Sequence, residues 1–160
     1  MTQRVRLDDI DRKILEELRR DGRMTNVELA RRVGISPPPC LRRVRALEEA
    51  GYIRGYHADL AAEQLGYGLT VFAWVGLHSQ KEADLEAFEE KVRSWPQVRE
   101  CHMLSGEVDF VLKCVAVDWD AWQTFLTREL TQADNVESVK TAPVLRLSKQ
   151  DFGVPLDAVE

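Results

Sequence analysis

Five arginines in one short stretch carry the clearest chemistry of this sequence. They are Arg31, Arg32, Arg42, Arg43 and Arg45, and no acidic residue occurs between positions 29 and 47. An arginine has a permanent positive charge and a planar fork of N–H donors, which suits phosphate oxygens and the base edges of nucleic acid. The stretch therefore predicts an anion-binding surface, provided that the elements around it present the side chains to a partner.

The charge of the chain is divided unequally. Residues 1–57 hold 13 Lys and Arg against 9 Asp and Glu, a net charge of +4, whereas residues 58–160 hold 9 against 18, a net charge of −9. The overall net charge of −5 therefore hides a basic first part. A local basic region on an acidic chain is typical of a nucleic-acid site.

A first helix is predicted over residues 9–21. Asp8 has the residue type of an N-cap, and Asp11 lies near the positive end of the helix dipole. Gly22 suits the left-handed position after the last turn. Apolar residues at three- and four-residue spacing give the helix one buried stripe, which consists of Leu7, Ile10, Ile14 and Leu18.

Two further short helices follow, joined at Gly34. Thr25 and Glu28 have capping-box spacing at the start of the second helix. Its expected buried side consists of Val27, Leu29, Ala30 and Val33. In the third helix we expect Leu41, Val44 and Leu47 to face inward, and the arginines at 42, 43 and 45 to face away. This is the geometry of a helix-turn-helix, whose second helix enters the major groove of DNA.

Prolines occupy positions 37, 38 and 39, at the start of the third helix. Proline is tolerated in a first helical turn, because the N–H groups there have no intrahelical acceptor. If Ser36 is the N-cap, its hydroxyl lacks its usual local donors and is free for a phosphate or a base. The helix can equally begin at Pro39, because residues before proline disfavour helical angles.

The domain boundaries follow from these signals. Residues 52–57 alternate around a glycine, which indicates a short strand or wing, with Arg54 placed to contact a phosphate. We expect a helix-turn-helix domain over 1–57, a linker over 58–68, a second domain over 69–150, to which the resemblance given below assigns effector binding and oligomerisation, and a tail over 151–160.

The second part of the chain shows strand and helix signals in the order βαββαβ. Strands are predicted over 70–77, 98–104, 108–117 and 136–148, the last interrupted by Pro143. A helix over 81–94 turns Leu85, Phe88 and Val92 inward, and a second helix, capped by Asp118, carries Trp122, Phe125, Leu126 and Leu130. The order is that of the ferredoxin-like fold. The fold class is therefore α+β, with a winged helix-turn-helix domain in front.

Both faces of the predicted sheet are apolar. In the first strand Phe72 and Trp74 lie on one side, and Val71 and Val75 on the other. The helices of this fold cover only one face, and monomeric proteins rarely expose a large apolar patch. The sequence therefore predicts a twofold-symmetric homodimer that carries two recognition helices.

Several motifs resemble those of the Lrp/AsnC family of leucine-responsive (feast/famine) transcription regulators. The first domain contains Leu7-Asp8-x-x-Asp11-x-x-Ile14-Leu15, Asp21-Gly22-Arg23-x-Thr25-Asn26-Val27-Glu28-Leu29 and Ser36-Pro37-x-Pro39-Cys40-Leu41-x-Arg43-Val44-x-x-Leu47-Glu48-x-x-Gly51. Glu100-Cys101-His102-x-x-Ser105-Gly106-x-x-Asp109 resembles the turn of their effector-binding, or RAM, domain. The resemblance spans residues 7–150. It implies a cytoplasmic regulator of promoter DNA whose dimers assemble further, often to octamers, and respond to an amino acid bound between subunits.

The resemblance places the DNA contacts at Ser36, Pro38, Arg42, Arg43 and Arg45. Arg43 and Arg45 are the leading candidates for contacts with base edges or phosphates. Pro38 stands where relatives usually have Thr or Ser, and Arg42 stands where an acidic residue is common. The first departure removes a hydroxyl and affects local capping, and the second predicts a different operator sequence and salt dependence.

The resemblance also places an effector pocket at Met103, Leu104, Gly106, Asp109, Pro143 and Val144. A zwitterionic amino acid needs donors for its carboxylate, which backbone N–H groups near Gly106 supply, and an acceptor for its ammonium, which Asp109 supplies. The alternative is that Gly106 only makes a hairpin turn and Asp109 only caps or pairs nearby. Pro143 departs from the β-branched residue frequent there, so leucine is not assumed as the effector.

Other functions fit the sequence less well. It offers no nucleophile–base set, no spacing of metal ligands, no cofactor motif and no membrane-spanning run, and its N-terminus lacks the apolar stretch of a signal peptide. Cys40, Cys101 and Cys114 suit free thiols, with Cys40 either a small core residue or a redox-sensitive thiol. The remaining alternatives are a ligand-independent architectural protein that wraps DNA and a small amino-acid-binding enzyme. An amino-acid binding screen separates the first of these from a sensor.

Overall fold

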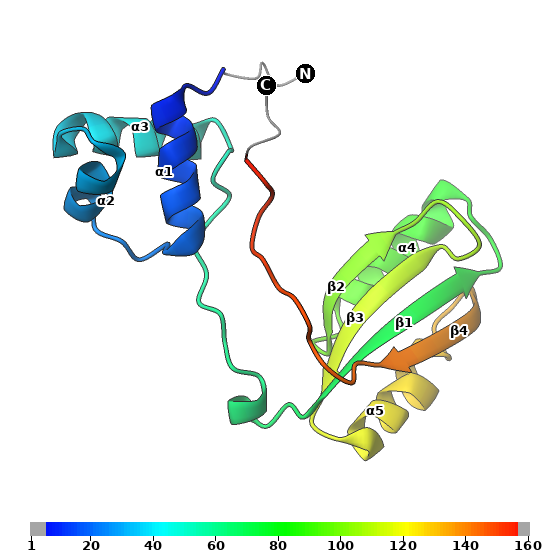
Figure 1. Ribbon diagram of the computed structural model, residues 1–160. Helices are drawn as coiled ribbons and strands as arrows, with labels where there is room; N and C mark the ends of the chain where they lie inside the picture. Colours follow the sequence, from blue (N-terminus) through cyan, green and yellow to red (C-terminus); the bar gives the residue numbers. More distant parts are fainter. Residues whose placement is uncertain (1–5, 157–160) are drawn as a thin grey trace. The chain divides into compact units, whose positions relative to one another are not determined.

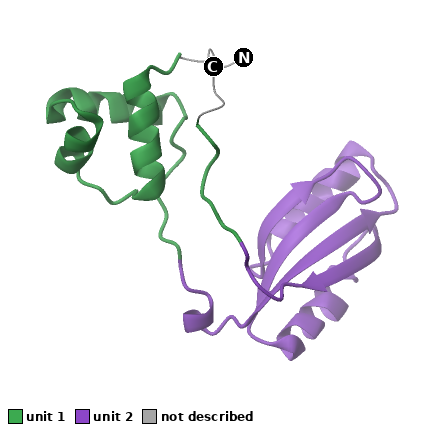
Figure 2. Ribbon diagram, viewed as in Figure 1, with its two compact units in different colours: residues 1–59, 149–160 green, residues 60–148 purple. Residues whose placement is uncertain are grey.

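The computed structural model describes residues 6–156, and the predictions for residues 1–5 and 157–160 lie outside this range. The described chain forms two compact units (Figure 2). The first unit combines residues up to 59 with the end of the chain from residue 149, and the second spans residues 60–148. The chain therefore passes from the first unit to the second and returns.

Helix α1 spans Asp9–Arg20 and begins as the sequence predicts. Asp8 is its N-cap, and Asp8 and Asp11 form a capping box in which each carboxylate accepts the other's backbone N–H, at 2.8 and 3.2 Å. The prediction of a left-handed Gly22 is wrong, because Gly22 is not among the residues with positive φ. Its missing side chain instead leaves space for the Tyr56 ring, which would lie 3.1 Å from an added Cβ.

Helix α2 spans Asn26–Val33, with Thr25 as N-cap and its end at Gly34, both as predicted. Gly34 is left-handed, with φ 80°. The Thr25 hydroxyl accepts the Glu28 N–H at 3.2 Å, but the other half of the predicted capping box is absent. The Glu28 carboxylate turns to the guanidinium groups of Arg31 and Arg32, because a charge-assisted pair is stronger than a bond to a neutral N–H. Val27, predicted to be buried, is 66% exposed.

Helix α3 spans Pro37–Glu49 and begins at the earlier of the two predicted positions, with Ser36 as N-cap. Its buried residues are Cys40 and Leu47, with Val44 half-buried. Leu41, predicted to face inward, is 39% exposed. Val44 and Leu47 lie inward as predicted, but Cys40 takes the buried place predicted for Leu41. The buried stripe therefore runs along positions 40, 44 and 47, and Arg43 lies on its flank.

The predicted wing strand over residues 52–57 is not confirmed, since residues 53–61 contain neither strand nor helix. Side chains hold this segment instead. Tyr56 lies against Gly22, and its hydroxyl donates to a Glu48 carboxylate oxygen at 2.9 Å. The described part of the first unit contains no second strand. A strand at this position would therefore form no backbone hydrogen bonds with a neighbour.

The second unit is a four-stranded antiparallel sheet in the order β2-β3-β1-β4 (Figure 1). Its elements follow η1 (Glu63–Leu65) and are β1 (Leu69–Leu77), α4 (Glu82–Arg93), β2 (Val98–Met103), β3 (Phe110–Ala116), α5 (Trp119–Phe125), which continues as a π-helical turn η2 (Leu126–Leu130), and β4 (Val136–Pro143). Asp118 caps α5 by accepting the Ala121 N–H at 2.8 Å, as predicted. The βαββαβ order and the ferredoxin-like sheet are confirmed.

Helices α4 and α5 pack on the same face of this sheet. Phe88 of α4 and Trp122 of α5 share one core with Val75 of β1 and Leu112 of β3. The opposite face carries Phe72, Trp74, Val111 and Val115, which alternate with these buried residues and are half-buried. One face of the sheet is therefore a hydrophobic core, and the other is apolar without a covering helix.

The last strand is shorter than predicted. β4 ends at Pro143, and Leu145 is 97% exposed, whereas the prediction extended the strand to residue 148. The Val144 N–H still donates to the Thr70 carbonyl at 2.8 Å. Because β1 begins at Leu69, no partner backbone remains for the residues beyond.

The segment after residue 149 lies along α1. Arg12 donates to the Leu156 carbonyl at 3.4 Å, and Arg19 donates to the Phe152 carbonyl at 3.3 Å. The two arginines are seven residues apart on α1, which is about 10 Å of helix. The described part of the expected tail is therefore attached to the helix-turn-helix unit.

Candidate functional site

Several arginines of the first unit are already paired with carboxylates. Arg19 and Arg20 contact Glu16, Arg31 and Arg32 contact Glu28, and Arg32 also reaches Glu17 at 2.9 Å. The pKa of Glu28 is lowered to about 2, mainly by its hydrogen bond with Arg31 and next by that with Arg32. The positive charge of α1 and α2 is thus largely compensated within the domain.

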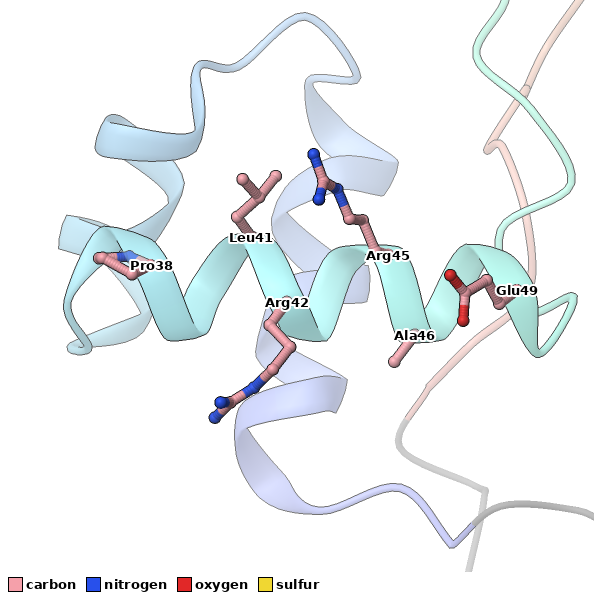
Figure 3. A pocket seen from close by; sticks show the side chains of 6 residues that line it. All are labelled: Pro38, Leu41, Arg42, Arg45, Ala46 and Glu49. Atoms are coloured by element: carbon pink, nitrogen blue, oxygen red, sulfur yellow. The ribbon is translucent and has the colours of Figure 1, made fainter.

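Arg42 and Arg45 differ from these arginines. Both are exposed, and neither has a hydrogen bond or ion pair with another residue in the described part of the chain. With Pro38, Leu41, Ala46 and Glu49 they line a shallow hollow on the outer face of α3. Figure 3 shows the two guanidinium groups extending to either side of this helix. Helical spacing explains the set, because positions 38, 41, 42, 45 and 49 fall on one side of an α-helix.

The first turn of α3 is unusual in its hydrogen bonding. Ser36 is exposed, and its hydroxyl makes no capping bond, as the proline run predicts. Asn26 donates its side-chain amide to the Pro37 carbonyl at 2.8 Å, which fixes the start of α3 against the start of α2. The helix-turn-helix pair is therefore joined at this corner by a side chain.

Arg43 lies on the inner flank of α3. It is three residues after Cys40 and four before Leu47, both buried. Its Nη1 donates to an Asp8 carboxylate oxygen at 2.7 Å and to an Asp11 carboxylate oxygen at 2.8 Å. The Asp11 N–H and then Arg43 lower the pKa of Asp8. Arg54 lies in the irregular segment after α3 and is exposed without such a contact in the described residues.

Sequence reasoning missed Leu41, Ala46 and Glu49 as members of the exposed face. The signal was present, because all three share helical spacing with Arg42 and Arg45. Cys40 is fully buried, and burial raises the pKa of its thiol, which supports its role as a core residue. Burial also raises the pKa of Cys101 to about 11 and that of Cys114 to about 12.

Four of the six predicted effector residues lie together around the β2–β3 turn, namely Met103, Leu104, Gly106 and Asp109. The Leu104 N–H donates to the Asp109 carbonyl at 2.8 Å, which closes the turn around Gly106. The Asp109 carboxylate accepts the Leu77 N–H through Oδ2 at 2.7 Å, at the position where the pairing of β1 with β4 is irregular. Met103 and Leu104 are 60% and 40% exposed, so this corner offers an apolar surface beside a carboxylate.

The other two, Pro143 and Val144, lie at a different corner of the sheet. Pro143 is opposite Val71 of β1, whereas Met103 is opposite Phe110, which is itself opposite Val75. The separation is four residues along β1, about 13 Å, and three strand spacings across the sheet, about 14 Å. One chain therefore does not bring the six residues into one pocket.

The open sheet face has an apolar centre and a charged edge. The ring centroids of Phe72 and Trp74 are 6.4 Å apart, and Trp74 is opposite Val111 on β3. On the neighbouring strands, Glu100 contacts Lys113 at 2.8 Å and His102 at 3.3 Å. This pattern of an apolar centre within a polar rim is that of a protein interface.

Metal-ligand clusters and membrane-spanning helices are both absent from the described residues. Between residues 6 and 156, no group of three or more His, Cys, Asp or Glu is arranged to hold a metal ion. No helix in that range has the length and apolar character needed to cross a bilayer.

Two family models match the chain. Residues 7–54 match a winged helix-turn-helix DNA-binding domain, and residues 70–154 match the Lrp/AsnC ligand-binding domain. Among curated proteins, the leucine-responsive regulatory protein of Rhizobium meliloti is 58% identical over 149 residues, which is 93% of this chain and 96% of that protein. The protein of the same name from Escherichia coli K12 is 42% identical over 90% of this chain and 88% of its own length.

Solved structures of similar sequence also include transcription regulators. A transcriptional regulator of Neisseria meningitidis, determined in complex with L-Met, has a TM-score of 0.91 and 40% identity, covering 95% of this chain and 98% of that one. Escherichia coli AsnC has a TM-score of 0.83 and 30% identity, covering 91% and 97%. The chain thus belongs to the Lrp/AsnC family of DNA-binding transcription regulators.

Proposed function

We propose that this regulator binds operator DNA through the outer face of α3, with Arg42 and Arg45 as the main donors. The observation that carries this proposal is that neither has a partner among the described residues, whereas every other arginine of α2 and α3 is paired with a carboxylate. Ser36 and Pro38 at the start of the helix, and Arg54 beyond its end, complete the proposed contact surface. Leu41 and Pro38 offer apolar contacts of the kind that a thymine methyl group accepts.

We propose further that two copies pair through the open sheet face. Phe72, Trp74, Val111 and Val115 form an apolar surface that a second, identical sheet covers with twofold symmetry. The dimer then presents two α3 helices to the two halves of a pseudo-palindromic site. Assembly of such dimers into a larger particle, such as an octamer, belongs to the same proposal.

The effector is proposed to be an amino acid held between subunits. The two groups of predicted pocket residues lie at different corners of one sheet, so a pocket that uses both requires a second chain. Asp109 then faces the ammonium, and backbone N–H groups near Gly106 face the carboxylate. The relative from Neisseria meningitidis that was solved with L-Met supports this ligand class.

A second candidate is a ligand-independent architectural protein. It is favoured by one interaction, in which Asp109 already accepts the Leu77 N–H and so has a purely structural use. A thermal-shift screen over the amino acids separates the two candidates. A ligand at about 100 times its dissociation constant adds roughly 2.7 kcal/mol to stability, and an architectural protein responds to none of them.

The named relatives are regulators, so we propose no catalytic activity, no resident cofactor or metal, and a place in the cytoplasm, where a regulator of this class meets DNA.

The DNA-binding surface is tested with the double variant Arg42→Ala/Arg45→Ala. The probe is a fluorescein-labelled duplex selected by the wild-type protein from a random-sequence pool. We expect the salt slope of log K to fall by about 0.9 for each phosphate that is no longer neutralised, while the oligomer stays intact. Arg93→Ala, which removes a paired arginine of α4, is the matched control. Unchanged affinity and slope in the double variant would rule out this surface.

A further inference from the structure

Arg43 and two aspartates of α1 form an ion-pair group beside the proposed DNA surface. Arg43 belongs to the arginine cluster of α3, yet its Nη1 is shared between Asp8 and Asp11, at 2.7 and 2.8 Å. Both N–H groups of that nitrogen are thereby used. Only 32% of the Arg43 side chain is exposed, and only 17% of the Asp11 side chain. Arg43 is thus the arginine of α3 that points into the domain.

All four carboxylate oxygens of the two aspartates accept a hydrogen bond. One oxygen of Asp8 accepts the Asp11 N–H and the other accepts Arg43. One oxygen of Asp11 accepts the Asp8 N–H and the other accepts Arg43. The capping box and the ion pair form one closed arrangement, in which the N-terminus of α1 is tied to the second turn of α3.

This arrangement acts on the helix that carries the exposed donors. Arg42 and Arg45 are close to Arg43 in the chain, so a rotation of α3 about its axis moves them together relative to the groove. A donor displaced by about 1 Å loses much of a directional hydrogen bond. Contacts with base edges depend on this orientation more than contacts with phosphates do.

We propose that Arg43 is a positioning residue for DNA recognition, which fixes the rotation of α3 by binding Asp8 and Asp11 and does not itself contact DNA. The inference rests on the proposed DNA-binding function. It reverses an ordinary electrostatic expectation, because carboxylates beside a DNA surface normally weaken binding by repulsion. Here Asp8 strengthens binding, since its effect through Arg43 is larger than its repulsion of phosphate.

The test compares neutral replacements of two adjacent acids in the full-length protein. Asn is as good an N-cap as Asp, so Asp8→Asn keeps the capping bond and removes the charge that holds Arg43. Asp9→Asn is the matched control, because Asp9 lies in the same turn and has no bond to Arg43 among the described residues. Affinity for the selected duplex is measured by fluorescence anisotropy over a salt series, at a temperature where circular dichroism shows every variant folded.

We expect Asp8→Asn to weaken binding roughly two- to five-fold, as the loss of one partly exposed ion pair implies, while Asp9→Asn leaves it unchanged or strengthens it. Arg43→Ala weakens binding more, roughly five- to twenty-fold, with the salt slope preserved. The double variant Asp8→Asn/Arg43→Ala binds no more weakly than Arg43→Ala, because both changes remove the same ion pair.

The opposite pattern overturns the proposal. A salt slope reduced by about 0.9 in Arg43→Ala, together with stronger binding by Asp8→Asn, makes Arg43 a direct phosphate contact. If Arg43→Ala fails to fold, the comparison of Asp8→Asn with Asp9→Asn decides alone. Failure of the proposed function is a different result, in which Arg42→Ala/Arg45→Ala binds the duplex as the wild type does.

Discussion

The two units of this chain present their functional surfaces in different ways. In the helix-turn-helix unit, one helix of thirteen residues carries most of the proposed DNA-binding surface, and Pro38, Arg42 and Arg45 line it together. In the sheet unit, the proposed effector residues are split between the β2–β3 turn and the end of β4. The first surface is complete in a single chain, and the second is not.

This difference separates the proposed recognition of DNA, which uses the first unit, from the proposed response to an effector, which uses the second. In the proposed function, each chain carries a complete DNA-binding surface, which allows weak binding by a single copy. The proposed effector site needs two chains, which ties the response to assembly. The proposed pairing through the apolar face of Phe72 and Trp74 supplies the second chain that this effector site requires.

The substitution Trp74→Glu tests this division most severely. Two carboxylates would enter the centre of the apolar contact, and a buried unpaired charge costs several kcal/mol. We expect an 18.3 kDa monomer at micromolar concentration, loss of the amino-acid response, and operator affinity lowered by at least about 100-fold, because the two α3 helices no longer bind as one unit. Sedimentation equilibrium and anisotropy measure these effects.

Glu86→Lys, on the exposed side of α4, is the control for a charge change outside the sheet face. A Trp74→Glu protein that remains dimeric and responds to its effector would show that the open face is not the interface.

A weaker effect is expected from Asp109→Asn. The Asn oxygen still accepts the Leu77 N–H, so the turn keeps its structure while the charge for the ammonium is removed. The loss of a charged hydrogen bond predicts an effector affinity lowered by about 10- to 100-fold, measured by calorimetry, with DNA affinity in the absence of effector unchanged. Glu107→Gln, on the exposed turn, serves as the control. Equal affinities for wild type and Asp109→Asn would favour the purely structural use of Asp109.

A minor effect concerns the stability of the first unit in acid. The pKa of Glu28 is lowered to about 2 by Arg31 and Arg32, so its stabilising effect is complete above its ordinary value of 4.5 and is lost as the pH falls from there towards 2. We expect Glu28→Gln to lower the melting temperature by a few degrees at most at pH 7, and to differ less from wild type at pH 2. Calorimetric melts over this range test it, and a difference that grows in acid would contradict the assignment.

Local sequence signals predicted the elements of both units well. The Asp8, Thr25 and Asp118 caps, the end of α2 at Gly34 and the βαββαβ order of the second unit are all confirmed. They succeeded because capping and alternation depend on neighbours within a few residues. The errors concern Gly22, Val27, Leu41, the end of the last strand and the wing, where distant contacts decide.

Residue types and their spacing suffice to specify the helix-turn-helix, the ferredoxin-like order, the basic stretch and the apolar character of both sheet faces, because each of these is encoded locally. Which arginines remain free depends instead on tertiary packing. Arg42, Arg43 and Arg45 are alike in sequence, but the packing of α3 on α1 directs Arg43 to Asp8 and Asp11 and leaves the other two exposed. The same holds for the described part of the tail, because Phe152 and Leu156 contact Arg19 and Arg12, which are more than a hundred positions away in the sequence.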